Sequence, residues 1–304
     1  KSAYEVDSEI DPSAGIIDYS KITSSGREYS AVINTSKKGG AYTNFQDAFE
    51  YVNRLGGGRI LVMPGTYIIS ENLTIYGDTS IEGITPADCI IDFNSGTNYL
   101  SVNALASDVD ISKLTFRNCQ NTTNGAIYID RGTRVAIENC SFFSNRTAGS
   151  QGFDIYAVGA YFLSINNCWG TDGATFFFGD NIGSTTGAVN EISNNYIDLY
   201  KDYVIEGGTI NNGAGEILYQ NNFITRSVRS IFFGEFSFSQ IRGNQIAGLG
   251  LTETAMDFRT TSFINLSNNY IYNYILHNIV VDNKITLNDT NITNTSNDNI
   301  MDNI

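Results

Sequence analysis

The sequence has 304 residues, and its 18 Lys and Arg against 32 Asp and Glu give a net charge of −14. This length fits one or two globular domains or a single elongated domain of repeats, and 41% hydrophobic residues with 18 Phe and 18 Tyr are enough to build a core. Such an acidic chain lacks the basic footprint needed by nucleic-acid and anionic-membrane binding, and its single His excludes a zinc site of several histidines.

The first elements along the chain differ from the rest. Residues 1–36 are mixed and polar, and we interpret them as an N-terminal arm or attachment segment. A short helix follows near residues 43–55, because Thr43-Asn44 can cap it and Gly56-Gly57-Gly58 can end it. Such a helix just before a repeat array would cover the open end of the core. One face of this helix would carry Phe45, Ala48, Phe49, Val52 and Leu55.

A six-residue pattern, apolar-x-Asn-(Asn or Cys)-x-apolar, then recurs along the chain. The fourth positions, counted from Leu114, are separated by steps of 26, 28, 27, 27, 22 and 25 residues. This period is too short for two helices with their turns, and the runs are β-branched and aromatic. The copies carry at this position Cys140, Cys168, Asn195, Asn222, Asn244 and Asn269.

The repeat predicts an all-β, single-stranded parallel β-helix with coils of about 22–28 residues. Each coil would hold three short strands and stack on the next at roughly 4.8 Å. An inward Asn at a fixed turn can satisfy the peptide groups that the bend leaves open. Cys140 and Cys168 share this position, and the coil spacing is longer than the Cβ separation that a disulfide prefers, so we expect free buried thiols.

The opening of the repeat region carries a family resemblance. The residues are Gly39-Gly40-Ala41-Tyr42-Thr43-Asn44-Phe45-Gln46-Asp47-Ala48, then Leu55-Gly56-Gly57-Gly58 and Pro64-Gly65-Thr66-Tyr67. This stretch resembles the start of pectate-lyase-like right-handed parallel β-helix proteins, and within them looks most like bacteriophage tailspike and tail-fibre members. The resemblance covers about residues 37–285 and implies the right-handed fold. It leaves residues 286–304 as a polar C-terminal tail.

The chain lacks the catalytic patterns of the enzymes in that superfamily, such as a Gly-His-Gly motif, so its sequence leaves open whether it is an enzyme. The best catalytic candidates are acids that end one set of strands, namely Asp180, Glu206 and Glu235, with Asp257 beyond them and Asp130 before them. If these acids are in register, neighbouring carboxylates lie about 5 Å apart, as in a retaining glycosidase. They would otherwise bind Ca²⁺ or be solvated surface acids. No other cofactor or metal is expected.

The residue that follows the fourth position of each copy should point outward, because the next one is apolar and should point inward. At this place the chain has Trp169, Tyr196, Phe223 and Tyr270, which predict an aromatic stripe along the surface. Such a stripe serves as an interface between chains, stacks on sugar rings, or is covered by a loop.

These features lead to three hypotheses for function. The leading one is a bacteriophage surface protein of the tail-spike or fibre type that attaches to a host polysaccharide, assembles as a homotrimer and contacts other virion proteins through its N-terminal arm. The second is a secreted polysaccharide hydrolase or lyase, and the third a purely structural surface component. All three place the protein on a virion surface or outside the cell, with no nucleic acid and no membrane insertion.

Overall fold

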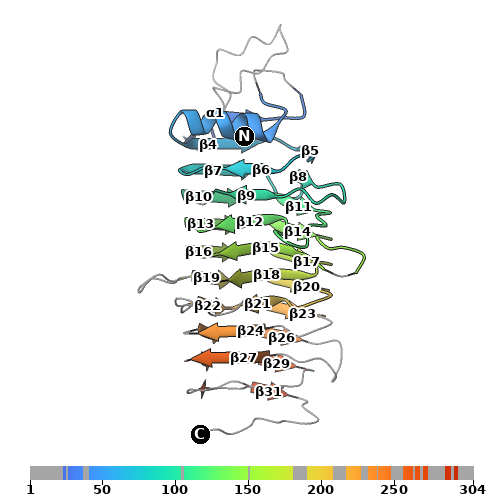
Figure 1. Ribbon diagram of the computed structural model, residues 1–304, viewed down its shortest axis with the longest axis vertical. Helices are drawn as coiled ribbons and strands as arrows, with labels where there is room; N and C mark the ends of the chain where they lie inside the picture. The colour runs from blue at the N-terminus through green and yellow to red at the C-terminus, as the bar shows by residue number, and fades with distance from the viewer. Residues whose placement is uncertain are drawn as a thin grey trace.

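The computed structural model is an elongated stack of coils with its N-terminal end and its C-terminal end at opposite poles (Figure 1). It describes side chains at residues 29–36, 41–103, 106–149, 151–180, 190–207, 217–226 and 240–246. Outside these ranges it describes only the backbone of several further strands. His277 and Asn269 lie outside the described residues.

The strands of the coils form three parallel sheets, and the chain passes through the sheets in turn as it advances along the axis. We call them the first, second and third sheets in the order in which a coil crosses them. Strands of one sheet come from successive coils, so neighbours in space are about one repeat apart in sequence. The predicted right-handed parallel β-helix is therefore confirmed.

The first sheet has 11 strands and begins before residue 37, inside the segment expected to be an arm, because Ala31 pairs with Ile60. Ahead of it, β1 (Thr23–Ser24) and β2 (Arg27–Glu28) form a small antiparallel pair. The strands of the first sheet are β3 (Ala31–Ile33), β4 (Gly58–Val62), β7 (Thr79–Gly83), β10 (Ser107–Ser112), β13 (Thr133–Glu138), β16 (Tyr161–Asn166), β19 (Asn190–Ser193), β22 (Ile217–Gln220), β25 (Ser239–Arg242), β28 (Ile264–Ser267) and β30 (Ile285–Asn288).

The second sheet has 10 strands, most of them only three residues long. Its last strand lies in the segment 286–304 that was expected to be a tail, so the paired strands extend beyond residue 285. The strands are β5 (Gly65–Ile68), β8 (Cys89–Asp92), β11 (Thr115–Arg117), β14 (Ser141–Phe143), β17 (Trp169–Thr171), β20 (Tyr196–Asp198), β23 (Phe223–Thr225), β26 (Gln245–Ala247), β29 (Tyr270–Tyr272) and β31 (Asn291–Thr293).

The third sheet has eight strands and occupies the remaining side of the coil. Alternate residues of its strands point inward, so that Ile127, Ile129, Ile155 and Ala157 are fully buried. The strands are β6 (Leu73–Ile75), β9 (Leu100–Val102), β12 (Ile127–Asp130), β15 (Phe153–Val158), β18 (Thr175–Asp180), β21 (Ile205–Gly207), β24 (Phe232–Ser237) and β27 (Met256–Ser262).

The fourth position of the repeat forms a buried ladder between the first and second sheets, as predicted. Asn222 Oδ1 accepts hydrogen bonds from the backbone N–H and the side-chain amide of Asn195, at 3.1 and 3.0 Å. Asn244 Oδ1 accepts the same pair of bonds from Asn222, both at 2.9 Å. Each Asn amide in this ladder therefore forms hydrogen bonds with polar groups at the turn of the preceding coil.

The two cysteines of the ladder replace the asparagine amides. The thiols of Cys140 and Cys168 are 3.6 Å from the carbonyls of Ile111 and Ile137, as the amide of Asn195 is 3.1 Å from the carbonyl of Ile165. Burial raises the pKa of the Cys168 thiol, and both cysteines are free and buried. The expectation of unpaired thiols is confirmed.

The third position of the repeat has a different task from the fourth. Asn139, Asn167, Asn194 and Asn221 have φ values of 54°, 51°, 56° and 54°, the left-handed region that Asn tolerates better than most residues. In the next copy Gly243 takes this place with φ 64°. One Asn therefore bends the chain and the next one fills the bend.

The helix α1 (Phe45–Arg54) caps the first coil (Figure 1), as expected. Asn44 Oδ1 accepts the N–H groups of Gln46 and Asp47, and Phe45, Ala48, Phe49 and Val52 are buried. Leu55 was expected on the same face, but it follows the last helical residue and is 57% exposed. The helix ends one residue earlier because Gly56 turns the chain with φ 82°.

We expect Asn195→Leu to lower the free energy of unfolding by about 1–3 kcal/mol, because it leaves the buried N–H of Cys168, 2.9 Å from Asn195 Oδ1, without its acceptor. Urea denaturation followed by circular dichroism measures the change. The matched control is Asn195→Cys, which places in this coil the residue that the two preceding coils already use and should lose less. An Asn195→Leu protein as stable as the wild type would contradict the role of the ladder.

Candidate active site

The outward face of the third sheet carries a row of aromatic residues that sequence analysis did not single out. Tyr128 is in register with Tyr156, and Tyr156 with Phe178. The ring centroids of Tyr128 and Tyr156 are 5.5 Å apart, and those of Tyr156 and Phe178 are 4.7 Å apart. Phe153 packs beside this row, 5.2 Å from Phe178. The signal in the sequence was the alternation of these residues with the buried Ile127, Ile155 and Phe177.

The predicted catalytic acids lie on this face, but not in the predicted register. Glu206 is aligned with Phe178, whereas Asp180 is two residues further along its own strand. The prediction that the carboxylates of Asp180 and Glu206 lie about 5 Å apart is therefore wrong. One coil of about 4.8 Å and two residues of about 3.3 Å each place their Cα atoms roughly 8 Å apart on a diagonal.

The third predicted acid, Glu235, follows Gly234, which is aligned with Gly207. Gly179, Gly207 and Gly234 are therefore aligned on successive coils. Glu235, like Asp180, lies one residue after its glycine. The backbone of its strand is described, but its side chain and that of Asp257 are not.

Two of the predicted acids, Asp180 and Glu206, act on the phenol of Tyr156. Burial, then Asp180, Tyr128 and Glu206 raise the pKa of its phenol. Both carboxylates therefore act on one hydroxyl, which stays protonated and able to donate a hydrogen bond at neutral pH. On the preceding coil Asp130 is paired with Arg131 at 2.9 Å, so its charge is compensated.

The aromatic stripe predicted on the second sheet is confirmed at its described members. Trp169, Tyr196 and Phe223 are aligned on successive coils, with ring centroids 4.9 and 5.2 Å apart. Trp169 is 57% exposed and Phe223 39%. The strand of Tyr270 continues the same column through Gln245, but its side chain lies outside the described residues.

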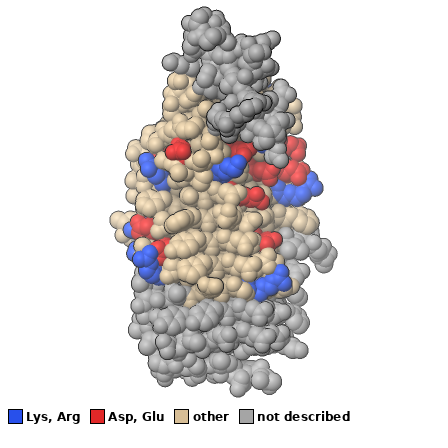
Figure 2. All heavy atoms as spheres, turned by 180° about the vertical axis from the view of Figure 1, so that it is seen from behind, with Lys and Arg blue, Asp and Glu red and all other residues tan. Residues whose placement is uncertain are grey.

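Paired charges accompany the stripe. Arg226 binds the carboxylate of Asp198, with Nε 2.8 Å from Oδ1, and Arg146 binds that of Asp172 at 3.0 Å. On the face of the molecule seen in Figure 2, the described charged residues lie mainly along the two sides, and other residues occupy the middle. Because the charges beside the stripe are paired, the stripe suits an uncharged, hydroxyl-rich ligand better than an ionic one.

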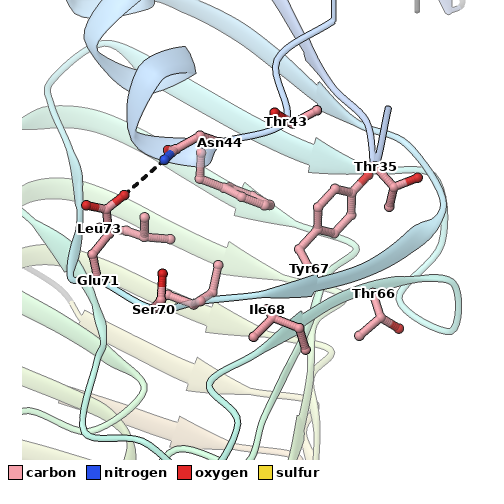
Figure 3. Close-up of a pocket in the computed structure, with 11 residues that line it drawn as sticks. Thr35, Thr43, Asn44, Thr66, Tyr67, Ile68, Ser70, Glu71 and Leu73 are labelled. Carbon is pink, nitrogen blue, oxygen red and sulfur yellow. Dashed lines mark hydrogen bonds between the residues drawn. The ribbon is translucent and has the colours of Figure 1, made fainter. Parts of the chain in front are cut away.

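A cavity of about 240 Å³ lies beside the N-terminus of α1, between the helix and strands β5 and β6 (Figure 3). Asn44 spans one side of it, where its Nδ2 donates to Glu71 at 3.0 Å. Tyr67 stands in its wall and donates its hydroxyl to the carbonyl of Met63 at 2.7 Å. Asn44, Glu71 and Tyr67 each have a partner inside the protein. The cavity adjoins β6, whereas Asp180 and Glu206 lie on β18 and β21, four and five coils further along the third sheet.

A buried polar cluster lies inside the solenoid, and sequence analysis missed it. Asp154 is completely buried and accepts hydrogen bonds from the amide of Asn145, at 3.0 Å, and from the hydroxyl of Tyr200. Burial raises the pKa of Asp154 to about 7. Gly170 and Gly173 make room for Tyr200, because a Cβ on Gly170 would stand 2.3 Å from its hydroxyl oxygen and one on Gly173 2.4 Å from its ring.

Within the residues that the structure describes, no group of three or more His, Cys, Asp or Glu side chains could hold a metal ion. The same part of the chain contains no helix long and apolar enough to cross a membrane.

The fold is similar to that of polysaccharide-acting enzymes. No family model and no curated protein matches the chain. Among solved structures, the catalytic domain of a GH87 α-1,3-glucanase in complex with nigerose has a TM-score of 0.63 at 15% identity, and the same kind of domain with tetrasaccharides one of 0.60 at 13%. Each comparison covers 90% of this chain and 60% of the glucanase chain. A pectin methylesterase from carrot has a TM-score of 0.46 at 12% identity, covering 88% of this chain and 85% of its own.

At these identities the comparisons show the fold alone, a parallel β-helix. The chain spans about three fifths of the length of the glucanase chains.

The buried carboxyl predicts an unusual pH dependence of stability. In the unfolded chain Asp154 has a pKa near 3.9, whereas in the fold it is about 7, so the folded state holds a proton that the unfolded state releases. Its contribution to stability is complete below about pH 4 and is lost as the pH rises toward 7. We expect Asp154→Asn to be more stable than the wild type at pH 8 by a few kcal/mol, with little difference at pH 4.

Urea unfolding of both proteins at several pH values measures this difference. Asp110→Asn, which changes an exposed aspartate of the first sheet, is the matched control and should leave the pH profile as it is. A wild-type and an Asp154→Asn protein with parallel pH profiles would show that the buried carboxyl is ionised in the fold.

Proposed function

We propose that this protein is an extracellular polysaccharide hydrolase that cleaves a neutral or weakly charged glycan on its third sheet. The observation that carries the proposal is the placement of Asp180 and Glu206 on adjacent coils of one sheet face, beside a row of outward aromatic rings. The shared fold with polysaccharide-acting enzymes supports it.

The spacing of the acids favours one stereochemical course. Inverting glycosidases hold their two carboxyl groups about 6.5–9.5 Å apart to leave room for a water, whereas retaining enzymes hold them about 5–5.5 Å apart. Asp180 and Glu206 point to the same side of one sheet, and their Cα atoms are roughly 8 Å apart on the diagonal. One acid would protonate the leaving oxygen while the other activates the water, with inversion at the anomeric carbon.

The remainder of the face would hold the substrate. The rings of Tyr128, Tyr156 and Phe178 give sugar rings an apolar surface along the axis. The Tyr156 hydroxyl, kept protonated by its surroundings, would donate to a sugar oxygen near the scissile bond. A net charge of −14 repels polyanions, which is why a neutral or weakly charged glycan is proposed.

The test is to incubate the protein with neutral glucans and to follow new reducing ends, while proton NMR reports the configuration of the first product. We expect Asp180→Asn and Glu206→Gln each to lower kcat by about 10²–10⁴-fold, because general acid and base groups contribute rate enhancements of this size. Glycan binding and the melting temperature should change little.

Asp110→Asn and Glu138→Gln serve as controls, since both replace exposed acids of the first sheet. Full activity of both third-sheet variants would place the chemistry elsewhere. Unsaturated products would show a lyase in place of a hydrolase. Binding without any product would leave attachment to a glycan as the function; the bacteriophage spike, its homotrimer and its virion partners stay predictions of the sequence.

A further inference from the structure

Three exposed aromatic rings and one half-buried ring gather on the second sheet, around a side of the coil that the proposed active site does not use. They are Phe143 on β14 and Trp169, Tyr196 and Phe223 on the next three coils. We propose that this surface is an accessory binding site for a neutral polysaccharide chain that lies along the solenoid axis. The class of ligand rests on the proposed function; the surface itself does not.

The size of the patch argues against a second copy of the protein as its occupant. Phe143 is 47% exposed, Trp169 57% and Phe223 39%, and Tyr196 is half-buried. With about 150–250 Å² for each whole aromatic side chain, the four rings expose roughly 400 Å². A stable protein interface covers about 800 Å² on each partner. A narrow patch of this extent is large enough to be functional and is matched better by a thin linear ligand.

The edge of the patch supplies polar groups without net charge. Thr171 lies two residues beyond Trp169 on β17 and is in register with Phe143 on one side and Asp198 on the other. Asp198 is paired with Arg226, so this edge offers a hydroxyl and a compensated ion pair. Such groups form hydrogen bonds with sugar hydroxyls and do not attract a polyanion.

The geometry of the rings indicates where the contact is centred. Tyr196 and Phe223 are stacked at an interplanar angle of 13°, so their faces cover each other and their rims point outward. Trp169 ends the row, because the preceding coil carries the small Ser141 at the aligned position. The indole of Trp169 is therefore the most exposed ring of the four. On the side of the small Ser141 its face is open, so that a sugar ring can stack there.

Trp169 is also the single Trp of the chain, which makes the site directly observable. We expect titration with the neutral glucans dextran or laminarin to shift the intrinsic tryptophan emission to shorter wavelength and to saturate, whereas dextran sulfate leaves it unchanged. Tyr196→Ala and Phe223→Ala should each weaken the apparent affinity about threefold to tenfold, since one aromatic contact contributes about 0.5–1.5 kcal/mol.

Phe162→Ala is the matched control, because Phe162 is equally exposed at 47% but belongs to the first sheet. Asp180→Asn should bind with the same emission change, because the third-sheet site is separate. An emission unaffected by every neutral glucan would overturn the proposal, as would a shift that depends on protein concentration and not on glycan, which marks self-association. The tryptophan emission does not depend on cleavage of the glycan. A failure of the hydrolase proposal would therefore appear only in the assay for reducing ends.

Discussion

The stacking of one coil on the next, with like positions in line, is the constraint on which the rest of this molecule depends. Each strand of three to seven residues receives its hydrogen bonds from the coils above and below, not from a neighbour in sequence. The asparagine ladder extends this rule to the bends, where Asn195, Asn222 and Asn244 pass hydrogen bonds along the axis. Because every position has an axial neighbour, any side chain that recurs becomes a row, and both aromatic surfaces are consequences of this arrangement.

Sequence alone predicted the features that recur. The ladder, the free thiols of Cys140 and Cys168, the outward stripe and the capping helix each depend on a repeated position or a local signal, and a count of residues locates them. The exposed Leu55 shows the limit of the local signal, since a helical wheel does not tell where a glycine ends the helix. The rows of the third sheet were missed because their strands are separated by segments of unequal length.

Register decided the chemistry of the candidate site. The sequence suggested that Asp180, Glu206 and Glu235 end their strands in register, but Glu206 precedes its glycine and the other two acids follow theirs. A displacement of two residues along a strand converts a spacing of about 5 Å into one of roughly 8 Å. That difference changes the proposed mechanism from a covalent displacement to an attack by water.

The cluster of Asp154, Asn145 and Tyr200 could not be derived from the repeat, because it exists where the repeat is broken. The interior position that Phe142 fills on one coil is occupied by Gly170 on the next, and the vacant volume is taken by the ring of Tyr200 from a turn outside the strands. A tyrosine hydroxyl brought into the core requires an acceptor, and Asp154 supplies it at the cost of its own charge. The glycine that replaces a large residue on one coil thus leads to a buried acid and to a stability that depends on pH. These effects follow from the packing of side chains and cannot be read from the repeat.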